Sequence, residues 1–149
     1  MRYFTVNEAN AMLPEVRGRL EACLVMRGHL RGLHSELSAR GHPPPPRGTP
    51  DLSGPPEVAK LKARYRGLFE AMSAEVDAIT SDGVQIKDLE TGLIDFPARM
   101  GGRDVLLCWK LGEPKVAFYH GHEEGFRGRK PLTDEACQEV AAGARRGQG

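Results

Sequence analysis

The spacing of the apolar residues changes near Gly83, and this change does most to limit what the chain can fold into. Before it, apolar residues recur every three or four positions, which is the period of an amphipathic helix. After it, apolar and polar residues alternate, which is the period of a strand with one buried face. Helices followed by strands indicate an α+β fold rather than repeated βαβ units.

Two helical stripes flank a proline-rich segment. Thr5 and Glu8 form a capping box, so a first helix is expected over residues 5–40, with a kink near Pro14 or an early end near Met12. The segment 41–56, GHPPPPRGTPDLSGPP, is expected to be an extended or disordered loop, and a second helix is expected over 57–80. The apolar stripes of this antiparallel hairpin are Ala9, Leu13, Val16, Leu20, Cys23, Leu30 and Leu37, then Val58, Leu61, Tyr65, Leu68, Met72, Val76 and Ile79.

Turn residues set the register of a four-stranded antiparallel meander over residues 83–121. Gly92 would close the first turn, Gly101 with Gly102 the second, and 111–114 the third. The expected cross-strand pairs are Ile86 with Phe96, Lys87 with Asp95, Asp88 with Ile94, Phe96 with Leu107, Ile94 with Trp109, Ala98 with Val105, Arg99 with Asp104, Val116 with Trp109, Phe118 with Leu107 and His120 with Val105. This register puts Phe118 and His120 on the face that the hairpin covers, and Pro97 predicts a local bulge.

The other face of the meander is more apolar than a solvated face should be, because it carries Leu106, Cys108 and Tyr119 beside Asp95. Two covers are possible. One is the segment 122–143, with a short helix capped by Thr133; the other is a second subunit. The tail 144–149 is expected to be disordered, and residues 1–149 to form a single domain.

Charge and composition exclude several function classes. The chain has 21 Lys plus Arg against 20 Asp plus Glu, a net charge of +1, so nothing drives it toward nucleic acid or a membrane surface. Its three cysteines lack a CxxC spacing, and the first residues lack the apolar core of a secretion signal. We therefore expect a cytoplasmic protein without a membrane span.

Several stretches of sequence resemble one family: RYFTVNEANAMLP, GVQIKDLETGLIDFPA, LLCWKLGEP and EEGFRGRKPL. They are similar to the bacterial domain of unknown function family 2203. The resemblance implies acidic residues at Asp88, Asp95 and Glu123, a histidine at His120, and the frame G-F-x-G-R-x-P over 125–131. His122 departs from this pattern, because relatives carry an aliphatic residue there. The resemblance names no activity.

The cations of the glycine-containing segment 125–131 have two possible roles. Arg127, Arg129 and Lys130 could bind an anion such as phosphate. Alternatively, Arg127 or Arg129 could pair with a carboxylate of the same chain, with Asp95, Glu123 and Glu124 as candidates, and fasten the segment as a structural clasp. The clasp is slightly favoured.

A candidate polar site consists of Asp88, Asp95, Arg99, His120 and Glu123. Asp88 is expected to be buried and to fix its turn by accepting a hydrogen bond, for example from the Trp109 indole. His120 is expected to be a hydrogen-bonded structural histidine, at the opposite end of the sheet from Asp88. The low-ranking alternative is a divalent metal bound by His120, His122 and Glu123.

The sequence therefore favours a non-enzymatic binding or assembly module without a cofactor. It would be a homodimer through the outer sheet face, or bind a protein partner. The alternative is an anion- or metal-dependent small-molecule enzyme with a site around His120, Glu123 and Arg129.

Overall fold

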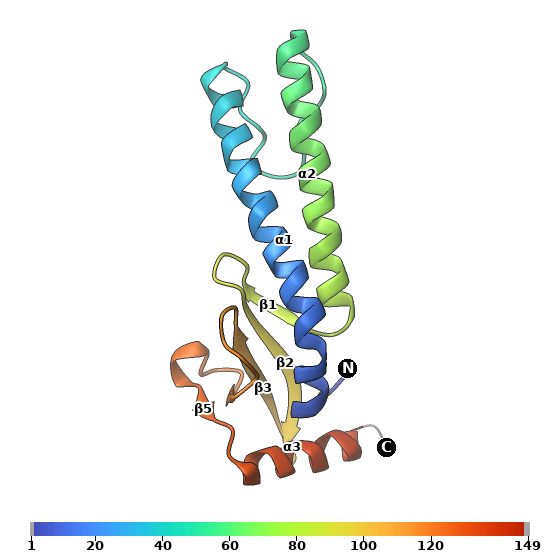
Figure 1. The fold of residues 1–149 in the computed structure, drawn as a ribbon, viewed down its shortest axis with the longest axis vertical. Helices are drawn as coiled ribbons and strands as arrows, with labels where there is room; N and C mark the ends of the chain where they lie inside the picture. Colours follow the sequence, from blue (N-terminus) through green and yellow to red (C-terminus); the bar gives the residue numbers. More distant parts are fainter. Residues whose placement is uncertain (1, 148–149) are drawn as a thin grey trace. The chain divides into compact units, whose positions relative to one another are not determined.

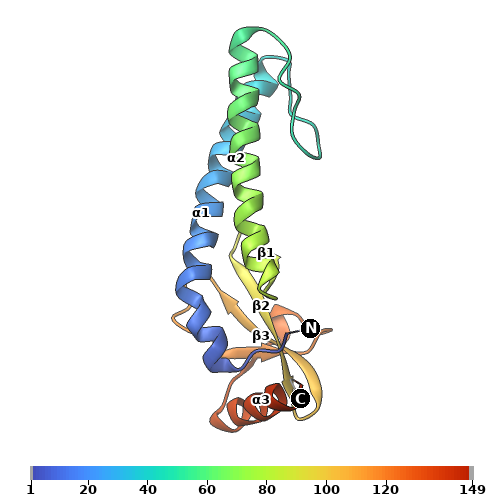
Figure 2. The ribbon, with the colours of Figure 1, turned by 90° about the vertical axis from the view of Figure 1, so that its right-hand side faces the viewer.

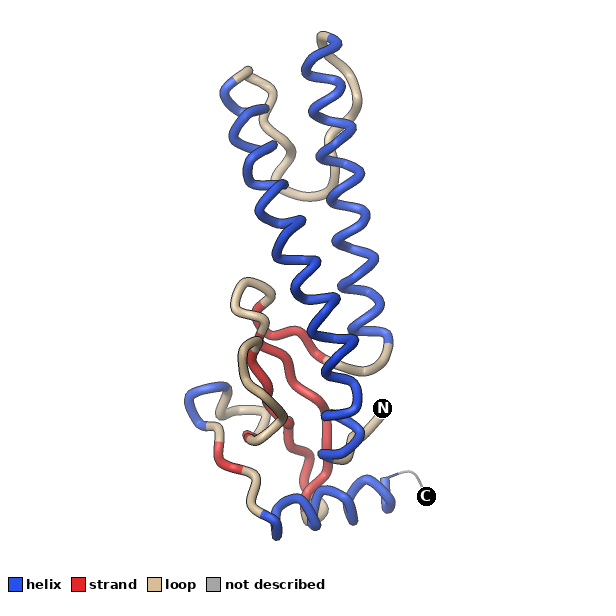
Figure 3. Tube along the Cα trace, in the orientation of Figure 1, coloured by secondary structure: helices blue, strands red, loops and turns tan. Residues whose placement is uncertain are grey.

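The computed structural model describes residues 2–147, with side chains as far as residue 143. It is an α+β structure with a five-stranded antiparallel sheet in the order β1-β2-β3-β4-β5, one strand more than the sequence predicts (Figure 1, Figure 3). Its elements are α1 (Val6–Ala39), α2 (Pro56–Ser81), β1 (Gln85–Asp88), β2 (Leu93–Met100), β3 (Arg103–Lys110), β4 (Phe118–His120), a 3-10 turn (Phe126–Gly128), β5 (Lys130–Pro131) and α3 (Asp134–Gly147). The chain forms two compact units: residues up to Gly18 together with those from Ala78 onward, and Arg19–Asp77. No helix among residues 2–147 is long and apolar enough to cross a membrane.

The first unit places the start of α1 on the inner face of the sheet. The expected capping box forms, since the Glu8 amide donates to Thr5 Oγ1 at 3.0 Å and the Thr5 amide to Glu8 Oε1 at 2.9 Å. Phe4 packs edge-on against Phe96 with ring centroids 5.3 Å apart. The apolar core of this unit consists of Phe4, Ala9, Leu13, Val16, Ile79, Val84, Ile94, Phe96, Ala98, Val105, Leu107, Trp109 and Val116, all of them buried.

The β2–β3 hairpin has the predicted register throughout, from Leu93 opposite Lys110 to Met100 opposite Arg103. Gly101 and Gly102 both have positive φ, 57° and 82°, as a primed turn requires. The predicted bulge at Pro97 is absent from this ladder. Pro97 accepts the Phe4 amide on its carbonyl at 2.8 Å, and the N and C=O of one strand residue point to the same side. The missing N–H therefore faces the N-terminal segment, and the ladder with β3 loses no donor.

The predicted register of β1 is wrong by one residue at Asp88, which lies opposite Leu93 instead of Ile94, and by two residues at Ile86. Ile86 lies opposite Ile94 and Gln85 opposite Asp95, and the register shifts between Ile86 and Asp88. This irregularity turns Asp88 outward, so it is exposed rather than buried. Asp88 still fixes the turn, but by accepting the Glu90 amide at 3.0 Å.

The predicted register of β4 is wrong by one residue. His120 lies opposite Leu106, and Phe118 lies opposite Cys108. Because side chains alternate along a strand, a slip of one residue moves each of them to the other face. His120 and Phe118 therefore lie on the outer face and not among the inner apolar residues. The Trp109 indole donates to the Glu113 carbonyl at 3.0 Å instead of to Asp88.

The outer face of the sheet is covered by the chain itself. Leu106 and Cys108 are each 1% exposed, beneath the segment that follows β4. Thr133 caps α3 as predicted, with the Ala136 amide 3.1 Å from its Oγ1. The expectation of disorder from residue 144 is wrong as far as Gly147, because α3 continues to that residue. Residues 148–149 lie outside the described part.

The second unit is a hairpin of α1 and α2, which lie side by side in two perpendicular views (Figure 1, Figure 2). Arg19 and Glu75 form an ion pair at 2.9 Å between the two helices. An apolar cluster lies where the proline-rich loop joins the two helices. It consists of Leu33, Leu37, Val58 and Leu61, with Tyr65 and Leu68 packed against it.

Two features of the helical segments differ from the expectation. α1 does not end near Met12: it continues to Ala39 with Pro14, an exposed residue, inside it. The proline-rich loop is tied to α2, since Lys62, only 8% exposed, donates to Asp51 Oδ1 at 3.3 Å and to the Ser53 carbonyl at 3.0 Å.

Candidate functional site

A buried polar cluster lies on the outer face, where β2, β3 and β4 run side by side. β2 supplies Asp95, which lies directly opposite Cys108 of β3, and β4 supplies His120. These three residues are 1%, 1% and 3% exposed. Buried polar groups on a strand face are costly unless they find partners, so the contacts among them decide what the cluster can do.

Both ring nitrogens of His120 face an acceptor. Nε2 lies 3.1 Å and 3.2 Å from the two carboxylate oxygens of Asp95. Nδ1 lies 2.7 Å from the Gly121 carbonyl, which can only accept, so Nδ1 carries a proton. A hydrogen bond between Nε2 and Asp95 needs a second proton, which lies between these two groups. The arrangement fastens the end of β4 to β2.

Cys108 lies beside this pair as a thiol rather than a thiolate. Burial raises its pKa, and the neighbouring Asp95 carboxylate raises it further, to about 11. Arg129 acts in the opposite direction, with Nη1 3.9 Å from the sulfur. Cys108 is therefore not an activated nucleophile in this structure.

Arg129 forms a two-pronged ion pair with Glu113. Nη1 and Nη2 donate to the two carboxylate oxygens at 3.0 Å and 2.6 Å. Its guanidinium carbon also lies 3.9 Å from the ring centroid of Phe118 and 4.4 Å from that of Phe126. This contact joins the segment after β4 to the loop after β3, as a clasp would, although its carboxylate is Glu113 and not Asp95, Glu123 or Glu124.

The Arg129–Glu113 contact also changes the acidity of Glu113. Burial alone would raise the Glu113 pKa, but the hydrogen bond from Arg129, helped by the Lys110 amide, outweighs burial and leaves the pKa lowered. The carboxylate is therefore charged at neutral pH, and the ion pair is fully formed there.

A small cavity of about 230 Å³ opens above the Asp95–His120 pair. Its walls combine apolar and polar groups, and its lining residues are Lys87, Leu93, Asp95, Leu106, His120, His122, Gly125 and Phe126. A cavity of this size admits a few atoms or water molecules above the polar cluster.

The other residues predicted from the sequence do not join this cluster. Arg99 pairs with Asp104 at 3.3 Å, as the register predicts. Lys130 pairs with Glu124 at 3.4 Å. The side chains of His122, Glu123 and Arg127 are exposed, and of these His122 lines the cavity. Among the described residues, Asp95, Cys108 and His120 place three possible metal-ligand atoms within 4.8 Å of one another, whereas the predicted set of His120, His122 and Glu123 is not gathered this closely.

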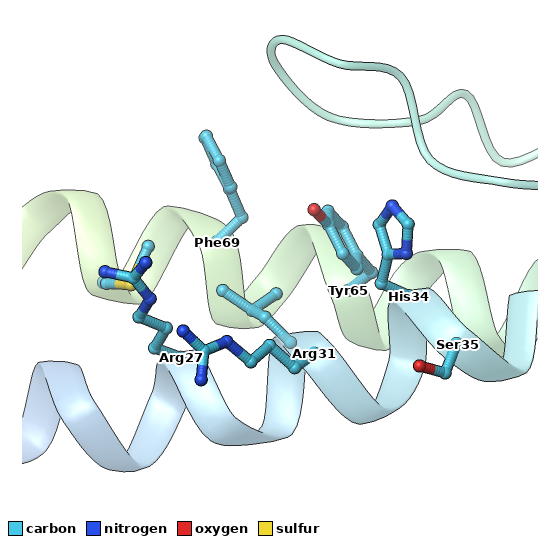
Figure 4. A pocket seen from close by; sticks show the side chains of 8 residues that line it. Arg27, Arg31, His34, Ser35, Tyr65 and Phe69 are labelled. Atoms are coloured by element: carbon cyan, nitrogen blue, oxygen red, sulfur yellow. The ribbon is translucent and has the colours of Figure 1, made fainter. Parts of the chain in front are cut away.

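A second hollow, of about 440 Å³, lies on the hairpin and is called the hairpin groove here. Tyr65 and Phe69 come from α2, while Arg27, Arg31, His34 and Ser35 come from α1 (Figure 4). Leu30 and Met72 complete its lining. The rings of Tyr65 and Phe69 are nearly parallel, at 15° with centroids 6.4 Å apart, and both are half-buried.

Comparison with known protein families shows which family the chain belongs to. A family model described as "Uncharacterized conserved protein (DUF2203)" matches residues 2–132. The chain belongs to this family. A search of curated proteins and a search of solved structures found no match. The family description states no activity, so function has to be argued from the cluster and the groove.

Sequence reasoning missed Cys108 as a partner of Asp95, although the signal was present. The correctly predicted β2–β3 register already placed these two side chains opposite each other on the outer face. His120 was missed as their neighbour because its register was wrong by one residue.

Proposed function

We propose that this protein is a non-enzymatic binding module whose hairpin groove binds an acidic amphipathic helix of a partner protein. The proposal rests mainly on one observation: a half-buried aromatic pair, Tyr65 and Phe69, lines a groove whose other wall is basic. Two packed helices commonly present such grooves to a third helix.

Apolar surface supplies the driving force for this binding. Leu30 at the floor of the hairpin groove is 7% exposed, whereas Tyr65, Phe69 and Met72 are half-buried. A third helix with apolar residues three and four positions apart would cover these side chains. Aromatic side chains in a groove often supply a large share of the binding free energy.

Charge determines the kind of partner. The α1 wall carries Arg27, Arg31 and His34, so the side chains on this side of the groove are basic. An acidic helix would complement this wall. A second copy bound through the same groove would bring like charges together, so the charge pattern opposes self-association there.

The other predicted roles receive less support. An enzyme site around His120, Glu123 and Arg129 has less support, because Arg129 is held by both carboxylate oxygens of Glu113 and the Glu123 side chain is exposed. A homodimer through the outer face has less support, because Leu106 is already covered by the chain itself and Tyr119, opposite Leu107, lies on the inner face.

The test is selection from a displayed library of amphipathic helices with varied charge. Acidic helices should be enriched, Phe69→Ala or Arg31→Glu should weaken their binding at least about tenfold, and added salt should weaken it further. Arg103→Glu makes the same charge change on exposed β3 and should leave binding unchanged. A library without binders, or binders that tolerate both groove variants, would refute the proposal.

A further inference from the structure

We propose that Asp95, Cys108 and His120 form a binding site for a transition-metal ion of the zinc type. The three residues offer one oxygen, one sulfur and one nitrogen, and these ligand atoms all lie within 4.8 Å of one another. Each side chain is buried, and each comes from a different strand of the sheet. The inference is independent of the hairpin groove.

The spacing of the ligand atoms suits a tetrahedral ion. With zinc bonds of about 2.0 to 2.3 Å, oxygen and nitrogen ligands lie about 3.3 Å apart, and sulfur lies about 3.5 Å from either. The observed separations of His120 Nε2 from the Asp95 oxygens are 3.1 Å and 3.2 Å. The Cys108 sulfur lies within 4.8 Å of both groups, so binding an ion would require a side-chain rotation that brings it closer.

The orientation of His120 is the one that metal-binding histidines adopt. Such histidines donate one ring N–H to a carbonyl or carboxylate and turn the other nitrogen toward the ion. Here Nδ1 donates to the Gly121 carbonyl at 2.7 Å, so Nε2 is the nitrogen left for a ligand. When the ion binds, the proton between Nε2 and Asp95 and the thiol proton pass to solvent.

Charge balance favours a divalent ion at this depth. A thiolate, a carboxylate and a neutral imidazole carry two negative charges, which cancel the two positive charges of the ion. A buried site without net charge avoids the cost of placing an unbalanced charge away from water. Arg129 Nη1, 3.9 Å from the sulfur, would stabilise the thiolate from outside the ligand set.

The ligand types also select the ion. Thiolate and imidazole favour zinc over magnesium or calcium, which prefer oxygen ligands. Two candidates exist for a fourth ligand, a water molecule in the cavity above the cluster or the His122 side chain that lines it. An ion here would join β2, β3 and β4 and would stabilise the folded chain.

The experiment is a titration of the tag-free, reduced full chain with Co²⁺, which reports both tetrahedral geometry and thiolate ligation in its absorption spectrum. One equivalent should produce a thiolate-to-cobalt band, and Zn²⁺ should abolish that band while Mg²⁺ does not. Cys108→Ser should remove the band, and Asp95→Asn should weaken binding at least about 100-fold. Cys137→Ser, on α3, is the matched control and should behave like the parent protein.

Two results would overturn the proposal. One is a parent protein that shows no cobalt band at excess metal and no rise in melting temperature with Zn²⁺; this test needs no variant to fold. The other is a band that survives in Cys108→Ser but disappears in His122→Ala, which would assign the ion to His120, His122 and Glu123. A folded Cys108→Ser variant, checked by circular dichroism, makes the two ligand sets distinguishable.

Discussion

Removing the Arg129 side chain is expected to destabilise the sheet unit measurably, because this side chain joins two segments that follow different strands. Arg129→Ala breaks both hydrogen bonds to Glu113, at 3.0 Å and 2.6 Å, and the contacts with the Phe118 and Phe126 rings. The ion pair is well shielded from solvent, with side chains 18% and 22% exposed. It should therefore contribute more than a surface pair does.

The size of the effect follows from these contacts. A hydrogen-bonded charge pair contributes about 1.5 to 3 kcal/mol, and each cation–π contact about 0.5 to 1 kcal/mol. Water can reach Glu113 once Arg129 is gone, and this offsets part of the loss. We expect Arg129→Ala to lower the free energy of unfolding by about 2 to 3 kcal/mol. Arg129→Lys should lower it by about 1 kcal/mol, because lysine keeps the charge but not the planar fork.

Urea unfolding of the parent and both variants measures these values, and Arg127→Ala is the matched control. Arg127 is exposed in the same segment, so its loss should change stability by less than about 0.5 kcal/mol. The effect of Arg129→Ala should also depend on pH. Because the Glu113 pKa is lowered from 4.5 in the folded chain, the stabilisation is complete above that pH and is lost as the pH falls below it.

Equal stabilities of Arg129→Ala and Arg127→Ala would refute the clasp. So would a rise in melting temperature with sulfate, at matched ionic strength, that disappears in Arg129→Ala. That result would mean that Arg129 binds an anion and that its contact with Glu113 is easily exchanged.

Three further predictions concern other parts of the chain. Leu37→Ala, at a fully buried position, should cost about 2 to 5 kcal/mol in urea unfolding, and Leu68→Ala, only partly buried, about half as much. The Asp51 carboxyl should titrate at about 2 in NMR, because hydrogen bonds from Ser53, and then from Lys62, lower its pKa. Lys62→Met should raise that pKa toward 3.8. The tie between the proline-rich loop and α2 should therefore persist at neutral pH and be lost as the pH falls from 3.8 through about 2. Leu106→Lys should lower the melting temperature strongly, since this residue is 1% exposed within one chain and a lysine there would bury a charge.

Short, well-defined turns made part of the sheet predictable. The β2–β3 register followed from Gly101 and Gly102, because a two-residue turn with positive φ at both positions allows only one pairing of the two strands. The β1 register failed for two reasons. The turn is one residue longer than predicted, since Asp88 pairs with Leu93, and a bulge, which alternation does not reveal, adds a second shift between Ile86 and Asp88.

The β4 register failed for a different reason. Residues 111–117 do not form a single tight turn: the Glu113 amide donates to the Lys110 carbonyl, and the Val116 amide donates to Asn10 Oδ1 at 2.8 Å. Asn10 is 106 positions away in the sequence, so no local pattern could reveal this contact. For the same reason, no local sequence pattern could show that Glu113 would be the partner of Arg129.

The hairpin was largely predictable because its apolar stripes have helical spacing. The positions expected on α1 are buried, from Ala9 to Leu37. On α2, Tyr65, Leu68, Met72 and Val76 are only half-buried. A stripe shows which side of a helix faces its neighbour, but not how fully two helices alone can cover it.

The β4 register is the central claim, because it alone brings His120 to Asp95 and Cys108. Cross-strand nuclear Overhauser effects between backbone protons measure it directly. The structure predicts that Leu106 pairs with His120 and Cys108 with Phe118. Pairing of Val105 with His120 and Leu107 with Phe118 would contradict it, since that register turns the imidazole to the opposite face, away from both proposed ligands.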